Sequence, residues 1–293
     1  MTRDVSTKHL TPYIARTMEK HQALWHSLEM TEISMDQIRA YEKDGVVCLR
    51  GVFDQYWIDL ITSGIEASIE TPGPHGENYN PDGSAFFGDL DMWQRHKEFR
   101  EFVLDSPSAE LVARLMGSIK VNFFYDQLLV KEPGSESATP WHQDQPYWAI
   151  SGRQVSSIWM PVDPVRSDSS LEFVAGSHQW GIEYNPRHFK DQSPYEDTGL
   201  PPMPDIEANR SSYSILSWDV EPGDCIVFQA MMIHGAKGNA CSQTRRRILS
   251  TRWAGDDARY CVRQGETAIP TFESNLVHGD KFSGELFPQV WPR

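Results

Sequence analysis

This 293-residue chain has few cysteines and no long apolar runs, and both features limit the classes of protein to which it can belong. The four cysteines, at positions 48, 225, 241 and 261, form no CxxC pair. They therefore predict free thiols in a reducing compartment, not a disulfide framework. No stretch is long and apolar enough to span a bilayer, and residues 1–10 lack the apolar segment of a secretory signal. We expect a cytoplasmic protein with no membrane partner.

Positive charge is also scarce, since 27 Lys and Arg stand against 41 Asp and Glu, giving a formal net charge of −14. A uniformly acidic chain binds polyphosphates poorly, so we expect no nucleic-acid partner. Hydrophobic residues make up 39% and charged residues 23%, which is typical of a globular protein. Internal repeats and low-complexity tracts are absent. The sequence leaves the oligomeric state open.

Composition shifts along the chain predict a single domain over residues 1–293. We expect four parts: a polar leader at 1–30, a helical buttress with one early strand at 31–117, a β-rich core at 118–260, and a C-terminal tail at 261–293. Five prolines and many charges between residues 184 and 210 predict an insertion loop in the core.

Local signals place elements within these parts. Ser34 to Gln37 forms a capping box that predicts a helix, and apolar spacing predicts further helices over 54–69 and about 96–117. Residues 46–49 predict a strand, and the Gly-, Pro- and Asn-rich stretch 71–88 predicts a long loop. Later β-rich runs, separated by turn signals, predict an antiparallel sandwich or barrel. These runs are 121–131, 155–161, 171–175, 213–218, 225–233 and 246–253.

Three polar residues far apart in the sequence carry the clearest chemical signal. His142 and Asp144 form a His-x-Asp pair, and His234 follows 90 residues later (234 minus 144). In extended backbone, residues i and i+2 point to one face, so both members of the pair can face a barrel interior. His234 ends the predicted strand 225–233. Two imidazoles and one carboxylate bind one face of Fe(II) and leave three positions open. The alternative is a surface hydrogen-bonded pair and a core histidine.

A basic run, Arg245 to Arg247, follows His234. An oxygenase that uses 2-oxoglutarate keeps an arginine at this position for the distal carboxylate of that co-substrate. Residues 246, 248, 250 and 252 share one face of the predicted strand. We therefore favour Arg246 for a bidentate contact with that carboxylate. Arg245 and Arg247 then point elsewhere, as in a solvated basic turn.

Other side chains near these motifs are candidates for the same pocket. Gln127 lies on the strand that leads toward the His-x-Asp pair, and it can donate a hydrogen bond to 2-oxoglutarate. Trp159 can wall the co-substrate pocket, and Tyr147 and Trp148 can line a substrate pocket. Each can equally be an ordinary core residue. His178, in a Gly-Ser-His turn, is an alternative histidine for which we expect a structural role.

The motifs together resemble the phytanoyl-CoA dioxygenase family of Fe(II)/2-oxoglutarate oxygenases over most of the chain. The resemblance rests on four segments: Asp44–Val52, Lys131–Trp148, Ser170–His178 and Glu221–Gly235. It implies a mainly β fold with flanking helices and a double-stranded β-helix (jelly-roll, cupin-like) core. It also implies that His142, Asp144 and His234 bind iron and that Arg246 binds 2-oxoglutarate. The family's arginine commonly falls one residue nearer the distal histidine, which keeps Arg245 as an alternative.

The implied activity is a non-haem iron dioxygenase with Fe(2+), 2-oxoglutarate and O2 as cofactor and co-substrates. It would hydroxylate an unactivated C–H of a small-molecule metabolite and release succinate and CO2. Halogenating relatives replace the carboxylate ligand by a small residue, so Asp144 disfavours halogenation. The alternatives are an acyl-CoA hydroxylase, a metal-barrel protein that does not use 2-oxoglutarate, and desaturation or cyclisation at the same site. Residues 71–88 and 184–210 are candidate lids.

Overall fold

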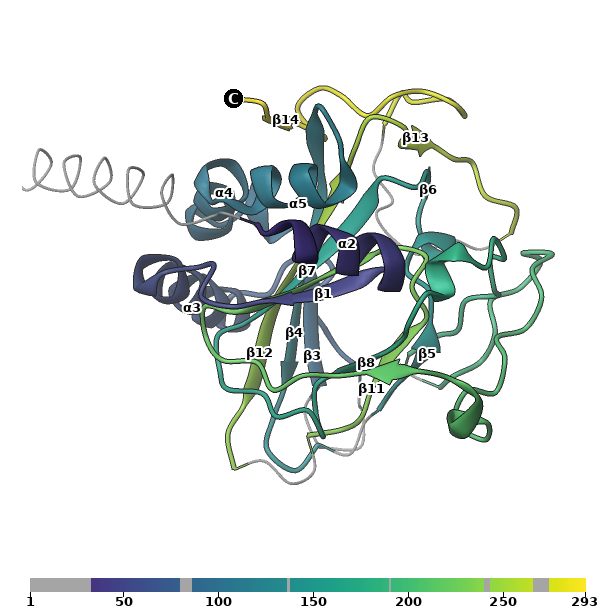
Figure 1. Cartoon of the computed structure of the whole chain (residues 1–293). Coiled ribbons are helices and arrows are strands. Elements are labelled where there is room, and N and C mark those ends of the chain that lie inside the picture. Colours follow the sequence, from purple (N-terminus) through teal and green to yellow (C-terminus); the bar gives the residue numbers. More distant parts are fainter. Residues whose placement is uncertain (1–32, 80–85, 136–137, 190, 240–242, 266–273) are drawn as a thin grey trace, which may run out of the picture. The chain divides into compact units, whose positions relative to one another are not determined.

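The computed structural model describes residues 33–79, 86–135, 138–189, 191–239, 243–265 and 274–293 (Figure 1). The predicted leader, residues 1–30, lies outside this part. Within it, the α-helices are α2 (Met35–Asp44), α3 (Gln55–Glu70), α4 (Lys97–Asp105) and α5 (Ser108–Met116). Short 3-10 helices are η1 (Met92–Gln94), η2 (Gln145–Tyr147), η3 (Ser177–Gln179) and η4 (Arg210–Ser212). None of these helices is long and apolar enough to cross a membrane.

Sequence signals explain where the helices begin and end. α2 starts at the predicted capping box, since the Gln37 N–H donates to Ser34 Oγ at 3.2 Å and the Ser34 N–H donates to Gln37 Oε1 at 2.8 Å. The single helix predicted over about 96–117 is wrong. It is split into α4 and α5, because Pro107 cannot continue the hydrogen-bond pattern of α4.

Two antiparallel sheets form the core of the described chain. The larger has the order β1 (Val46–Leu49), β10 (Cys225–Gln229), β7 (Val155–Pro161), β12 (Arg246–Ala254), β4 (Val121–Lys131), β3 (Phe86–Leu90) and β2 (Glu77–Asn78), with β14 (Gln289–Trp291) beside β4. The smaller has the order β5 (Thr139–His142), β11 (His234–Ala236), β8 (Leu171–Val174) and β9 (Ile215–Leu216). A separate ribbon pairs β6 (Ile150–Ser151) with β13 (Arg259–Tyr260).

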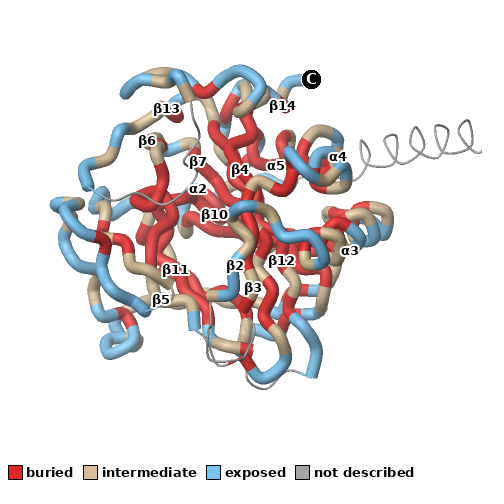
Figure 2. The backbone as a smooth tube through the Cα atoms, turned by 180° about the vertical axis from the view of Figure 1, so that it is seen from behind, coloured by how far each residue is buried: buried red, intermediate tan, exposed pale blue. Residues whose placement is uncertain are grey.

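The helices lie against one side of the larger sheet, and the smaller sheet lies on its other side (Figure 1). The predicted mainly β, jelly-roll fold with flanking helices is therefore confirmed, as two facing sheets and not as a closed barrel. Buried residues follow the strands and the inner helix faces in Figure 2. Along β4, Leu128 and Val130 pack toward the helices, while Tyr125 and Gln127 face the space between the sheets. Period-two alternation thus puts polar side chains into that space.

The segment 71–88, predicted as a long loop, contains strand structure. β2 and β3 pair with each other, and β3 pairs with β4, so this segment extends the larger sheet. β4 is 11 residues long, and its edge offers backbone groups that Phe86–Leu90 satisfies. Residues 80–85 lie outside the described part. The C-terminal segment likewise adds a strand, since β14 pairs with β4.

The predicted strand 225–233 is shorter than expected, and His234 does not end it. β10 stops at Gln229, where the Met232 N–H donates to the Gln229 carbonyl at 2.9 Å to close a turn. His234 instead begins β11 in the smaller sheet. The chain therefore crosses from one sheet to the other immediately before the predicted ligand.

Three of the four cysteines lie in the described part, and all three, Cys48, Cys225 and Cys261, are free thiols as the sequence predicts. Cys225 is buried in β10, and burial raises the pKa of its thiol well above the ordinary value. Cys241 lies outside the described residues.

Asp91, between β3 and η1, gives a testable dependence of stability on pH. Burial raises the pKa of its carboxyl from 3.8 to about 7, while Arg95 lowers it and Asp89 raises it by smaller amounts. Between these pKa values the folded chain holds a proton that the unfolded chain has lost, so stability falls as pH rises through this window. In urea unfolding at about pH 8, we expect the free energy of unfolding of Asp91→Asn to exceed that of wild type by about 1–3 kcal/mol. Near about pH 4 the two free energies should be equal. Asparagine tolerates the left-handed backbone there (φ 55°). A difference that is constant from acid to alkaline pH would contradict this origin.

Candidate metal centre and pocket

The two sheets bring the three predicted ligands together. His142 ends β5 and His234 begins β11, and the two residues are direct partners in the antiparallel pairing. Asp144 Oδ1 lies 3.5 Å from His142 Nε2 and 3.7 Å from His234 Nε2. One candidate ligand atom from each residue lies within 4.8 Å of the others, and all three residues are buried. This cluster of two imidazoles and a carboxylate matches the donor set of a facial iron site.

Hydrogen bonds behind the cluster orient each ligand. His142 Nδ1 lies 2.8 Å from the Pro140 carbonyl, and His234 Nδ1 lies 3.0 Å from the Met232 carbonyl. A carbonyl at Nδ1 keeps the proton there, so Nε2 presents its lone pair to the centre of the cluster. Ser157, on β7, donates its hydroxyl to Asp144 Oδ2 at 3.0 Å. The carboxylate is thus held from the larger sheet while Oδ1 faces the histidines.

Electrostatics favour the protonation states that metal binding requires. Burial, and to a smaller extent the electrostatic influence of the His142 ring, lowers the pKa of His234 to about 3, so the His234 imidazole is neutral at neutral pH. Burial acts to raise the pKa of Asp144, but His234, His142 and Arg252 together outweigh it, and the net pKa lies below the ordinary range. A neutral imidazole beside an ionised carboxylate needs no proton release before it binds a divalent metal.

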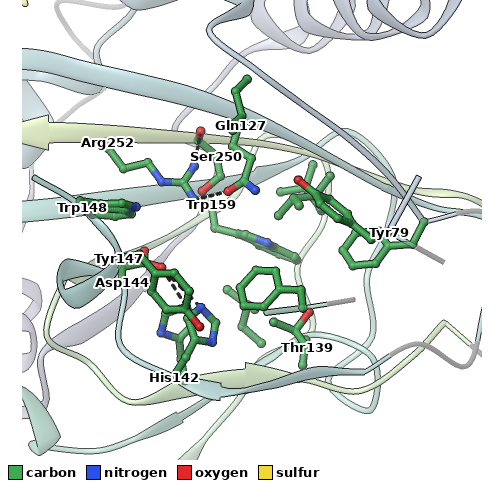
Figure 3. A pocket seen from close by; sticks show the side chains of 18 of the residues that line it. Tyr79, Gln127, Thr139, His142, Asp144, Tyr147, Trp148, Trp159, Ser250 and Arg252 are labelled. Carbon is green, nitrogen blue, oxygen red and sulfur yellow. Dashed lines mark hydrogen bonds and ion pairs between the residues drawn. The ribbon is translucent and has the colours of Figure 1, made fainter. Parts of the chain in front are cut away.

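The cluster opens into a cavity of about 370 Å³ between the sheets (Figure 3). In this view His142 and Asp144 lie at one end, Tyr79 and Thr139 at the other, and Gln127 and Trp159 between them. All the residues predicted for the pocket line this cavity. They are Gln127, His142, Asp144, Tyr147, Trp148, Trp159, His234 and Arg246.

Only one arginine of the basic run faces the cavity. Arg246 is 6% exposed, and its guanidinium donates to the Ser169 carbonyl. Burial lowers its pKa to about 10, and no described acidic side chain forms an ion pair with it. Arg245 instead pairs with Glu132 at 2.9 Å, and Arg247 pairs with Asp163 at 2.6 Å. The structure therefore places Arg246, and neither neighbour, at the pocket.

A second buried arginine lines the cavity, and our sequence reasoning did not single it out. Arg252 donates to the Ser250 carbonyl and to Gln127 Oε1, both at 2.7 Å (Figure 3). Its guanidinium also lies over the rings of Tyr125, at 4.9 Å, and Trp148, at 5.6 Å. The alternation that selected Arg246 also includes residue 252, so the signal was present. Gln127, predicted to contact 2-oxoglutarate, uses its side-chain oxygen to accept from Arg252.

His178, the alternative histidine, lies outside the cluster. Its Nε2 is 3.2 Å from the Glu42 carbonyl at the end of α2. In the part of the chain that the structure describes, the group formed by His142, Asp144 and His234 is the only set of three or more such side chains close enough to share a metal.

Aromatic residues from the insertion cover the metal end of the cavity. The ring of Phe189 lies 5.0 Å from the ring of His142, and Tyr195 lies 5.4 Å from Tyr147. Tyr147 also anchors this segment, because its hydroxyl donates to the Arg187 carbonyl at 2.7 Å and accepts from the Arg187 N–H at 2.8 Å. The insertion is thus fastened at a residue three positions after Asp144.

Removing this hydroxyl should loosen the insertion. We expect Tyr147→Phe to lose about 1–3 kcal/mol of local stability, because two partly buried backbone groups of Arg187 lose their partner. Trypsin should then cleave after Arg187 about 5- to 150-fold faster than in wild type. The matched control is Tyr213→Phe, three residues after the insertion, whose ring packs against Trp180. Equal cleavage rates in wild type and Tyr147→Phe would show that this anchor does not hold the segment.

Comparisons with known proteins agree with this geometry. The model of the family described as Phytanoyl-CoA dioxygenase (PhyH) matches residues 41–247. A probable phytanoyl-CoA dioxygenase of Caenorhabditis elegans is 22% identical over 271 residues, which covers 83% of this chain and 82% of the relative. An ectoine dioxygenase of Bordetella parapertussis is 21% identical over 228 residues, or 74% of each chain.

Solved structures share the fold at similarly low identity. The non-haem α-ketoglutarate-dependent carbocyclase SnoK from nogalamycin biosynthesis has a TM-score of 0.71 and 21% identity, and covers 88% of this chain and 97% of its own. The epimerase SnoN, solved with Fe3+, α-ketoglutarate and nogalamycin RO, has a TM-score of 0.69 and 18% identity, and covers 92% and 99%. At this identity the structural likeness establishes the arrangement of the two sheets.

Proposed function

Because the chain belongs to the phytanoyl-CoA dioxygenase family, we propose that it is an Fe(II)- and 2-oxoglutarate-dependent dioxygenase that oxidises a small molecule. One observation carries the proposal. A buried His-Asp-His cluster shares a cavity with Arg246, a buried guanidinium that forms no ion pair with the described acidic side chains. The first feature fits a metal and the second fits an anionic co-substrate.

The donor set fits iron. His142, Asp144 and His234 would hold the ion from one side, and Ser157 and two backbone carbonyls would keep these ligands in place. When bound, Fe(II), 2-oxoglutarate and O2 supply the oxidising chemistry, and for hydroxylation the balance is R–H + 2-oxoglutarate + O2 → R–OH + succinate + CO2. The protein contributes orientation of the reactants and exclusion of bulk water.

Arg246 would bind the distal carboxylate of 2-oxoglutarate. A buried charge without a counter-ion is unfavourable, and a carboxylate that pairs with it in two hydrogen bonds relieves that cost. The cavity positions of Trp159 and Gln127 support their roles as co-substrate neighbours. Arg252, which lies close enough to Asp144 to lower its pKa, adds a second positive charge near the metal end.

A compact small molecule is the proposed substrate, and Tyr147 and Trp148 are its proposed contacts. With Phe189 and Tyr195, these rings form an apolar wall next to His142. The alternative, an acyl-CoA, is supported by the name of the family. It is disfavoured by a net charge of −14, which repels the phosphates of coenzyme A.

We further propose that residues 33–293 act as one catalytic unit in the cytoplasm. Both main sheets contribute to the site, and residues of the C-terminal segment contact its edges. The free thiols of Cys48, Cys225 and Cys261 fit a reducing compartment.

The test is anaerobic titration of the purified protein with Fe(II) and 2-oxoglutarate, followed by the weak visible absorption band of their chelate. We expect a band that requires both additions, and succinate release once air and a suitable substrate are admitted. A folded protein that binds Fe(II) but forms no chelate would exclude 2-oxoglutarate and favour another metal-dependent activity of the same fold. Turnover of acyl-CoA esters, with no turnover of the corresponding free acids, would select the alternative substrate class.

A further inference from the structure

A partly buried arginine near the C-terminal end of the chain, Arg263, donates hydrogen bonds to the backbone that follows Asp144. Arg263 comes after β13, beyond residues 41–247 that the family model matches, and its side chain is 11% exposed. It does not line the metal cavity. Arg263 can therefore affect the site only through the backbone and side chains that its guanidinium contacts.

Four hydrogen bonds fix this guanidinium. Nε donates to the Trp148 carbonyl at 2.9 Å, and Nη2 donates to the carbonyls of Gln145 at 3.0 Å and Ile150 at 2.7 Å. Nη1 donates to Glu183 Oε2 at 2.6 Å. Because the five N–H groups of arginine are rigidly arranged in one plane, few conformations of residues 145–150 can satisfy all of these bonds. This stretch begins one residue after Asp144, and it includes Tyr147 and Trp148, which line the cavity.

The same side chain links this stretch to the insertion. Glu183 accepts from Arg263 and, at 3.5 Å, from Gln145 Nε2. The next residue, Tyr184, donates its N–H to Gln143 Oε1 at 2.9 Å, and Gln143 Nε2 donates to the Ile182 carbonyl at 3.0 Å. Residues 182–184 are thus fastened both to the residue between the two ligands and, through Arg263, to the residues that follow them.

We propose that Arg263 is a positioning residue that couples two parts of the site. It holds residues 145–150, and so the carboxylate of Asp144, in the geometry that binds metal. It also holds residues 183–189, at the start of the insertion, over the cavity, where His188 and Phe189 form part of the wall. The inference rests on the proposed function only in that the cluster binds a divalent metal. The packing role is independent of 2-oxoglutarate.

The first measurement is hydrogen exchange of the metal-free full chain. In Arg263→Met we expect faster exchange in residues 145–150 and 183–189, with the strands of the larger sheet unchanged. Arg259→Met is the matched control, because Arg259 donates to the carbonyls of Asp256 and Ala258 in its own turn. A uniform rise in exchange across the chain, or the same local rise in Arg259→Met, would overturn the proposal.

The second measurement is the affinity for Co(II) alone, followed by the visible absorption of the bound ion. We expect about 10- to 100-fold weaker binding in Arg263→Met, the range found when contacts behind metal ligands are removed. Arg263→Lys, which can pair with Glu183 but cannot reach three carbonyls, should restore protection of the insertion without restoring the affinity. Glu183→Gln should show the converse, with a loosened insertion and nearly wild-type affinity.

Wild-type Co(II) affinity in a folded Arg263→Met variant would overturn the positioning role. So would full recovery of affinity in Arg263→Lys, which would assign the effect to charge alone. If Arg263→Met fails to fold, the Lys and Gln variants carry the same test. Failure of the proposed 2-oxoglutarate chemistry would leave both readouts as expected here, since neither includes the co-substrate.

Discussion

Asp144→Ala is expected to abolish divalent-metal binding at micromolar concentrations and, with it, turnover of 2-oxoglutarate. The carboxylate is the only charged member of the candidate ligand set, and its Oδ1 lies within 3.7 Å of both imidazole Nε2 atoms. Removing a contact behind a ligand already costs about 10- to 100-fold in affinity, so removing the ligand itself should cost more than about 100-fold. The measurement is the same anaerobic titration with Fe(II), with Co(II) as a second metal.

A matched control separates ligation from general electrostatic attraction. Among the described residues, Glu77 is the other acidic residue that lines the cavity, so Glu77→Gln removes the same charge from the same cavity. If Asp144 acts as a ligand, the Glu77 variant keeps nearly wild-type metal affinity. Equal losses in the two variants would mean that the cavity attracts cations by charge alone. Thermal unfolding of each metal-free variant establishes that the comparison is made on folded protein.

Local patterns were sufficient for much of the fold. Runs of β-branched and aromatic residues, bounded by turn signals, predicted β4, β7 and β12 at nearly their observed bounds. Patterns were insufficient where pairing decides the structure. β3 forms because the edge of β4 is available, and no signal within the Gly- and Asp-rich stretch around it reports that edge.

Short motifs also predicted most of the candidate site, but they did not reveal residues that contribute through contacts distant in the sequence. His142 ends β5 and Arg246 begins β12, so both lie where strand patterns placed them. Asp144 lies beyond β5 with helical backbone (φ −73°, ψ −45°), so the expected extended spacing does not account for its place in the cluster. Arg263 lies on no motif, since its contacts to Gln145 and Glu183 bridge 118 and 80 residues. Contacts at such separations depend on how the whole chain folds, and a single sequence does not encode them in any local pattern.

The alternation along β12 predicts that Arg246, and not Arg245, binds 2-oxoglutarate. A comparison of Arg246→Met with Arg245→Met tests this prediction directly. Arg246 is 6% exposed and faces the cavity, whereas the side chain of Arg245 is 43% exposed and pairs with Glu132. A desolvated, bidentate pair with the distal carboxylate of 2-oxoglutarate loses about 3–5 kcal/mol when one partner is removed. We therefore expect about 150- to 5,000-fold weaker binding of 2-oxoglutarate to Arg246→Met, measured by the chelate band at fixed Fe(II).

Metal affinity without co-substrate should be unchanged in Arg246→Met, because its guanidinium contacts the Ser169 carbonyl and none of the three ligands. Arg245→Met should bind 2-oxoglutarate within about twofold of wild type, since exposed ion pairs contribute about 0–1 kcal/mol. The reverse ranking would assign the co-substrate to Arg245 and require β12 to shift by one residue. A shift of that kind would move residues 246, 248, 250 and 252 out of the cavity together, so the two variants also test the register of the strand.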